Sequence, residues 1–143
     1  MPSMSLVYDA VNVGDALPPL SLPPLTRTTL ALYAGASGDH NPMHIDIDFA
    51  RAAGMPDVFA HGMLSMAWLG RLLTHWAPQR DLREFNVRFS ALTRVGERIL
   101  CTGRITAKLE RDGEQFFRIA VATANEAGEV KLTGEALVAA STS

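Results

Sequence analysis

The C-terminal half of the chain alternates between apolar and polar residues, as half-buried β-strands do. The alternation covers four segments, at about residues 85–91, 99–109, 117–121 and 130–138. Asp112-Gly113 predicts a tight hairpin turn between the second and third segments, and residues 125–128 predict the next turn. We therefore expect at least four antiparallel strands, the last three joined by short turns.

The longest apolar segment, from about His61 to Trp76, has helical spacing instead of alternation. Apolar residues cover nearly every side of this helix, which is typical of a buried helix. A sheet wrapped around it would explain the missing polar face, so the pattern predicts an α+β domain. Polar residues interrupt the segment, and it falls short of the roughly 20 apolar residues that span a membrane.

The N-terminal half is predicted to be less regular. Residues 7–17 can form a short strand or an extended arm, and prolines keep residues 17–24 extended. We expect a short helix at 26–36, terminated by Gly38, and a second one at 49–53. Between these helices lies a polar loop, residues 38–48, that contains two histidines and three aspartates.

Composition narrows the class of protein further. A chain of 143 residues, with 48% hydrophobic and 20% charged residues, fits one globular domain covering 1–143. The net charge of −2 argues against nucleic-acid binding. The one cysteine, Cys101, lies in a strand pattern and fits a reducing compartment. The first residues do not resemble a secretory signal, so we expect a cytoplasmic protein.

Asp39 and His44 are the candidate catalytic residues of the polar loop. A turn formed by Asn41-Pro42 lies between them and can bring the two side chains together. A carboxylate and an imidazole that meet can hold one water molecule and exchange its proton near neutral pH. If the carboxyl of Asp39 were buried among apolar residues, its pKa would rise, as general acid catalysis requires. The alternative is a tight turn in which Asp39 and Asn41 bind backbone amides.

A longer pattern favours the catalytic interpretation. Residues 37–44, Ser-Gly-Asp-His-Asn-Pro-Met-His, followed by His61-Gly62-Met63, resemble the signature of the MaoC-like (R)-specific enoyl-CoA hydratases and related 3-hydroxyacyl-thioester dehydratases. The similarity extends to residues 86–89 and 95–97. The resemblance implies the hot-dog fold, in which a curved antiparallel sheet wraps a long helix. It also implies a homodimer, or a higher oligomer or heterodimer.

The same resemblance implies roles for individual residues. Asp39 and His44 match the catalytic pair, and Asn41 matches a position that orients the site. Gly62 matches the residue whose backbone N–H receives the thioester oxygen. The start of a helix suits that role, because free N–H groups and the helix dipole favour negative charge. The substrate would be an acyl-CoA or acyl-carrier-protein thioester. The CoA or phosphopantetheine is then part of the substrate, and the chain needs no cofactor of its own.

Four further residues are candidate contacts to the thioester or its phosphates: His61, Met63, Arg88 and Arg94. His61 either shapes the oxyanion site or caps the helix, and Met63 either packs in the core or lines an acyl tunnel. The arginines either bind phosphate or belong to the solvated surface. His40 and His44 have the spacing of metal ligands, but Pro42 breaks any helix between them, so we expect no metal site.

Two other functions fit the same fold. A hot-dog thioesterase would need an acidic residue on or beside the central helix, and residues 61–76 contain none. The chain could instead be a subunit of a heteromeric dehydratase that needs a partner. It keeps both Asp39 and His44, so it would be the catalytic half of such a pair.

Overall fold

The computed structural model describes residues 2–142. Its elements, in chain order, are η1 (Tyr8–Ala10), β1 (Leu20–Ser21), α1 (Arg27–Ser37), η2 (Pro42–His44), α2 (Ile47–Ala52), α3 (Gly62–Trp76), η3 (Gln79–Asp81), β2 (Leu82–Phe89), β3 (Leu100–Arg111), β4 (Glu114–Ala124) and β5 (Val130–Ala139). Strands β2 to β5, the hairpin at Asp112-Gly113 and the long helix were all predicted from the sequence pattern, whereas the two-residue strand β1 was not.

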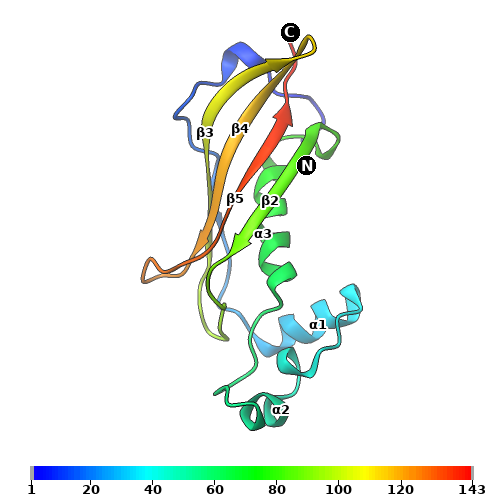
Figure 1. Cartoon of the computed structure of the whole chain (residues 1–143), viewed down its shortest axis with the longest axis vertical. Coiled ribbons are helices and arrows are strands. Elements are labelled where there is room, and N and C mark those ends of the chain that lie inside the picture. Colours follow the sequence, from blue (N-terminus) through cyan, green and yellow to red (C-terminus); the bar gives the residue numbers. More distant parts are fainter. Residues whose placement is uncertain (1, 143) are drawn as a thin grey trace.

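The strands form one antiparallel sheet in the order β1-β3-β4-β5-β2. Asp112 and Gly113 both have positive φ angles, 52° and 81°, as a two-residue hairpin turn with the twist of the flanking strands requires. Irregularities in register occur on three of the strand pairs and increase the local twist. The curled sheet lies against α3 (Figure 1), which confirms the expected α+β hot-dog architecture.

The core lies between the inner face of the sheet and one side of α3. Leu69, Leu72 and Leu73 of the helix are buried, and so are Ile105 and Ile119 of the sheet. Cys101 is also buried there, as predicted, and burial raises the pKa of its thiol to about 12. At neutral pH the thiol is therefore protonated and unreactive.

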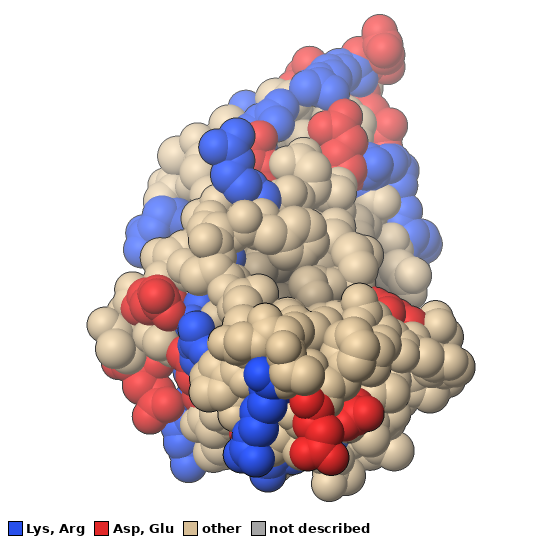
Figure 2. Space-filling view, turned by 60° about the horizontal axis from the view of Figure 1, so that its bottom comes forward, with Lys and Arg blue, Asp and Glu red and all other residues tan. Residues whose placement is uncertain are grey.

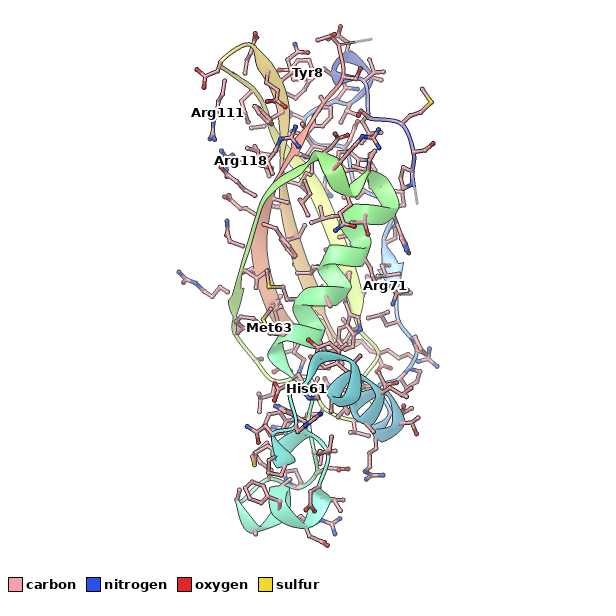
Figure 3. All side chains as sticks on the ribbon, turned by 90° about the vertical axis from the view of Figure 1, so that its right-hand side faces the viewer. Tyr8, His61, Met63, Arg71, Arg111 and Arg118 are labelled. Carbon is pink, nitrogen blue, oxygen red and sulfur yellow. The ribbon has the colours of Figure 1, made fainter. Side chains whose placement is uncertain are left out.

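The expectation that α3 is buried on every side is wrong. Met63 is exposed, and so is every fourth residue after it, namely Ala67, Arg71 and His75. Met63 is 56% exposed, although it is apolar. The sheet curls over only one side of the helix, and no segment among residues 2–142 covers the other side (Figure 3). The sequence pattern identifies which faces of a helix are apolar. It does not identify which segment, or which partner, covers each face.

The N-terminal segments match the predictions in position, with small shifts in their bounds. Thr26 caps α1 by accepting a hydrogen bond from the Thr29 amide. Residues 7–17 are mainly an extended arm that contains η1 and touches the sheet at two isolated bridges. Helices α1 and α2 lie beyond the N-terminal end of α3 (Figure 1). No helix among residues 2–142 is long and apolar enough to cross a membrane.

Candidate active site

The turn that carries Asp39 begins where α1 ends. Gly38 takes a left-handed conformation, with φ at 78°, and its N–H donates to the Ala34 carbonyl. The chain then reverses, and Asn41 starts the short helix η2 by accepting a hydrogen bond from the Met43 amide at 3.1 Å. Pro42 occupies the first position of η2, where its missing N–H costs nothing. Local sequence therefore builds this turn.

Asn41 also contacts the candidate acid directly. Its backbone N–H donates to Oδ1 of Asp39 at 3.2 Å. The Asp39 amide in turn donates to the Ser37 hydroxyl oxygen at 3.1 Å. Both hydrogen bonds are of the local kind that a simple turn would show. The bond from the Asn41 amide nevertheless fixes the direction of the Asp39 carboxylate, so the turn also shapes the candidate site.

His44 is half-buried at the end of η2 and is oriented by a backbone carbonyl. Its Nδ1 lies 2.7 Å from the carbonyl oxygen of Phe59. A carbonyl only accepts hydrogen bonds, so Nδ1 carries the proton and Nε2 of the neutral ring holds a lone pair. The Phe59 ring stands edge-on to the imidazole, with centroids 5.0 Å apart. His44 is therefore held in a tautomer that can accept a proton at Nε2.

His61 lies against His44 and is 1% exposed. The two imidazole rings stack with centroids 4.0 Å apart, and Tyr33 of α1 meets His61 edge-on at 4.8 Å. Nε2 of His61 donates to the backbone carbonyl of Asp39 at 3.2 Å, whereas its buried Nδ1 has no partner among residues 2–142. Burial lowers the pKa of His61, which favours the neutral ring. His61 thus supports both the loop and His44 without adding a charge.

Asp39, His44 and His61 converge at one point. One nitrogen or carboxylate oxygen from each lies within 4.8 Å of the others. These distances would admit a metal ion, but imidazole lone pairs lie in the plane of the ring. Two rings that stack at 4.0 Å, with only 27° between their planes, cannot aim their lone pairs at a common ion. One ring would have to turn before the three residues could share a metal.

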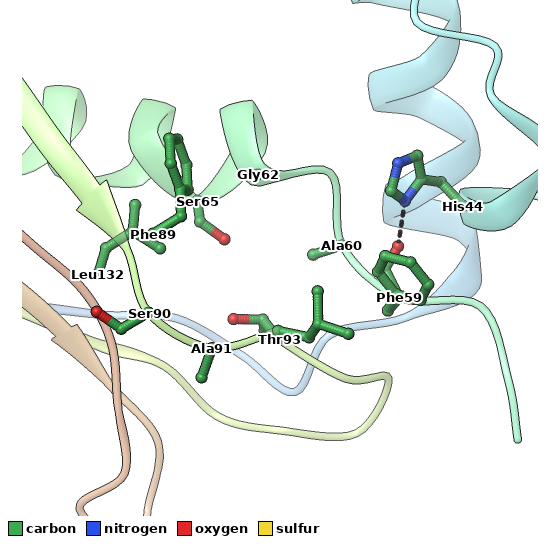
Figure 4. Close-up of a pocket in the computed structure, with 11 residues that line it drawn as sticks. His44, Phe59, Ala60, Gly62, Ser65, Phe89, Ser90, Ala91, Thr93 and Leu132 are labelled. Atoms are coloured by element: carbon green, nitrogen blue, oxygen red, sulfur yellow. Dashed lines mark hydrogen bonds between the residues drawn. The ribbon is translucent and has the colours of Figure 1, made fainter. Parts of the chain in front are cut away.

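A cavity of about 330 Å³ connects His44 with the start of α3. Its walls come from four segments of the chain, and Figure 4 shows the residues that line it: His44, Phe59, Ala60, Gly62, Ser65, Phe89, Ser90, Ala91, Leu92, Thr93 and Leu132. On the outer surface, the end of the molecule that faces the viewer in Figure 2 is mainly uncharged around its central hollow. Charged side chains gather toward the margins of that face.

Gly62 places a backbone amide at this cavity. It is the first residue of α3, so its N–H has no acceptor inside the helix. The positive end of the helix dipole lies at the same point. A Cβ atom on residue 62 would come within 3.1 Å of the Phe89 ring. Glycine therefore lets the Phe89 ring approach the backbone closely at the start of α3.

This combination of fold and site agrees with comparisons with known proteins. A family model described as MaoC like domain matches residues 16–129. The (R)-specific enoyl-CoA hydratase of Rhodospirillum rubrum is 30% identical over 116 residues, which are 80% of this chain and 78% of that protein. The chain belongs to the MaoC-like domain family.

Solved structures support this assignment. The R-hydratase PhaJ1 from Pseudomonas aeruginosa superposes with a TM-score of 0.84 at 26% identity, over 97% of this chain and 88% of that one. A chain of the ChsH1-ChsH2 complex from Mycobacterium tuberculosis superposes with a TM-score of 0.77 at 24% identity, over 91% of this chain and 98% of that one. The second likeness concerns the fold alone.

Several predicted site residues lie elsewhere than expected. The side chain of Asp39 is exposed in this MaoC-like chain and is not buried among apolar residues. The loop lies at an open end of the fold, where none of the described residues covers the Asp39 side chain. Met63 is exposed, which excludes the core interpretation, and it does not line the cavity. Arg88 and Arg94 are also exposed and do not line the cavity, as solvated surface residues would be.

Sequence reasoning missed residues that only the MaoC-like fold brings to the site. Phe59 contributes a carbonyl oxygen, which any residue type could supply, so no sequence signal marked it. Ser65 lies one turn after Gly62 and lines the cavity, and its polar side chain in an apolar helix was a usable signal. The Thr93 hydroxyl is buried and has no partner among the described residues. Thr93 comes from a loop far along the chain, and its position could not be predicted.

Proposed function

We propose that this chain hydrates trans-2-enoyl thioesters to (R)-3-hydroxyacyl thioesters and catalyses the dehydration in reverse. One observation carries the proposal. A ring nitrogen of His44 lies within 4.8 Å of a carboxylate oxygen of Asp39, and the His44 imidazole lines a cavity that Gly62 also lines. An acid–base pair beside a cavity with an oxyanion donor is what the addition of water to a conjugated thioester requires.

In the proposed reaction, the thioester carbonyl oxygen accepts a hydrogen bond from the Gly62 amide. Negative charge grows on that oxygen as the nucleophile attacks C3, because the double bond is conjugated with the carbonyl. The amide and the helix dipole are already aimed at this position, so stabilisation needs little reorganisation. The absence of a Cβ atom at Gly62 permits the close approach.

Asp39 and His44 hold the attacking water between them. Ionised Asp39 and neutral His44 both accept hydrogen bonds, so each binds one O–H of the same water molecule. One of them removes a proton as the oxygen bonds to C3, and that proton is then delivered to C2. Water is thereby added across the double bond, and the pair returns to its starting protonation state. Asn41 contributes by holding the carboxylate of Asp39.

We further propose that the substrate brings its own CoA or carrier-protein phosphopantetheine, and that the chain acts as a homodimer or as part of a larger or mixed assembly. Strand β2 is an edge strand, and the exposed side of α3 includes Met63. Phe89, at the end of β2, is also exposed. A second subunit on this side would cover the apolar residues and close the open end around Asp39.

The decisive experiment is to incubate the purified chain with crotonyl-CoA. Loss of the conjugated-thioester absorbance, without release of free thiol, is the expected result, and chiral analysis of the product should give the (R) isomer. Release of CoA thiol would instead identify a thioesterase. Hydration only after a partner subunit is added would identify a heteromeric dehydratase. A panel of enoyl-CoA chain lengths then defines the preferred acyl group.

A further inference from the structure

One wall of the cavity is a loop, not a helix or strand. Four consecutive residues that follow β2 line the cavity: Ser90, Ala91, Leu92 and Thr93. Such a loop has no regular hydrogen-bond ladder of its own, so its shape depends on contacts with other segments. The contacts that hold it converge on one buried charged residue of the sheet.

Lys131 is that residue. It belongs to β5, it is 1% exposed, and its ammonium group binds three acceptors. Nζ donates to the Leu92 carbonyl at 2.7 Å, to the carboxylate of Glu97 at 3.0 Å and to the carboxylate of Glu129. All three N–H donors of the ammonium therefore have a partner. The backbone carbonyl of Lys131 accepts from the amides of Ser90 and Ala91 at 2.8 and 3.1 Å.

Glu97 secures the other end of the loop. Its carboxylate accepts from the Arg94 amide and from the Asn125 side chain, both at 2.6 Å. Burial by itself raises the pKa of Glu97, but these hydrogen bonds and the ion pair with Lys131 outweigh burial and lower it. Glu97 is therefore ionised at neutral pH. The loop is tied to the turn between β4 and β5, to which Asn125 belongs.

The held loop in turn contacts the segment that orients His44. The Thr93 carbonyl accepts from the Ala60 amide at 2.9 Å, and Arg94 forms a bridge with Phe59. Phe59 provides the carbonyl that fixes the His44 ring. A continuous chain of hydrogen bonds therefore leads from Lys131 through Leu92 and Thr93 to the imidazole.

We propose that Lys131 and Glu97 are positioning residues, which hold the 90–94 wall of the cavity and, through residues 59 and 60, the orientation of His44. Their role in turnover rests on the proposed function, whereas their role in holding the loop does not. A buried ion pair is weak evidence for stability alone, since apolar residues of similar size often replace such a pair without loss. We assign this ion pair a different role, which is to hold the 90–94 loop in one conformation. Such a role matters for turnover because catalysis is sensitive to displacements of about 1 Å.

The test compares Lys131→Met with Phe117→Leu. The methionine keeps the length of the side chain and removes the ammonium. Phe117→Leu is a matched control for lost stability, because Phe117 is fully buried at the opposite end of the core. For crotonyl-CoA hydration by folded protein, we expect kcat to fall about tenfold or more in Lys131→Met, with a smaller change in KM. Phe117→Leu should keep both constants within about twofold.

Hydrogen exchange provides a readout that does not require activity. The amides of Ala60 and Ala91 should exchange about tenfold faster in Lys131→Met than in Phe117→Leu, because the Ala60 amide donates to Thr93 of the released loop and the Ala91 amide itself belongs to that loop. If Lys131→Met does not fold, Glu97→Gln tests the same link with less disruption, since Lys131 keeps Leu92 and Glu129 as partners. Its expected effect has the same direction and is smaller.

The outcomes separate the two proposals. If the natural chain hydrates no enoyl thioester, while Ala60 and Ala91 exchange faster in the variant, the proposed function fails and the positioning role stands. If the natural chain is active and the variant matches Phe117→Leu in both kcat and exchange, the positioning role is overturned and the function stands.

Discussion

The two ends of α3 are built from the same helix and have opposite chemistry. At its C-terminal end, Trp76 meets the Phe117 ring at 5.8 Å, and Tyr8 stacks on the other side of Phe117 at 5.8 Å. Aromatic rings close this end of the core. At the N-terminal end, His61 and Gly62 face a cavity and a polar loop. One end is packed for stability, and the other stays open.

The difference follows from what each end can stabilise. The N-terminus of a helix offers free N–H groups and a positive dipole, which suit a developing oxyanion. Closing that end with aromatic rings would bury these donors without partners, at a cost in free energy. The C-terminal end has no use in this chemistry and can be filled. We therefore expect substitutions at the two ends to affect different properties.

The largest effect is expected from the proposed acid–base pair, Asp39 and His44, at the open end. Asp39→Asn and His44→Ala should each lower kcat for crotonyl-CoA hydration by about 10²–10⁴-fold, because each removes a group that handles the proton. Thermal unfolding should change little, since both side chains lie at the edge of the fold. Asp48→Asn and His75→Ala are the matched controls, an exposed acid of the same region and an imidazole at the other helix end. Near-full activity in both site variants would refute the assignment.

The closed end should show the reverse pattern. Phe117→Ala removes a buried ring that packs between Tyr8 and Trp76, and should lower the free energy of unfolding by about 3–5 kcal/mol. The folded fraction should keep its kcat, because the cavity lies at the other end of α3. Urea unfolding and turnover at low temperature measure the two properties. Loss of kcat in fully folded protein would show that the two ends are coupled.

A smaller effect is expected when pH is varied. Burial lowers the pKa of His61 in the native state, so the unfolded chain binds a proton more readily than the folded one. The contribution to stability is complete above the unfolded pKa of about 6.5 and is lost progressively as pH falls below it. One such group gives a slope of at most about 1.4 kcal/mol per pH unit. His61→Gln should reduce this slope in urea unfolding measured from pH 7.5 to 5; an unchanged slope would assign it to other groups.

The smallest effect concerns the wall of the cavity. Thr93→Val replaces a buried hydroxyl without a partner in residues 2–142 by a methyl group of similar size. Because an unsatisfied buried hydroxyl is costly, the free energy of unfolding should rise by about 1 kcal/mol. Differential scanning calorimetry measures the change, with Thr102→Val, an exposed threonine of β3, as control. A loss of stability would mean that the Thr93 hydroxyl has a partner in solution.

Prediction from the sequence succeeded where local rules decide the structure. Alternation identified four strands, and Asp112-Gly113 identified the hairpin, because a turn of this kind needs positive φ angles. The Asn41-Pro42 turn was correctly placed between Asp39 and His44, because an asparagine cap and a proline at the first helical position act over a few residues. The failures concern exposure. The long helix was expected to be buried on every side, yet Met63 is exposed, because burial depends on which surfaces meet in space.

The sequence by itself determined the secondary structure, the family signature and the two residues that face each other across the loop. Periodicity and turn chemistry act over a few residues, so they can be read along the chain. Only the tertiary structure decided that the carbonyl of Phe59 fixes His44, that His61 stacks on it, and that Lys131 holds a wall 40 residues away in the chain. These contacts join segments that are distant in sequence, and they depend on how the sheet curls around α3.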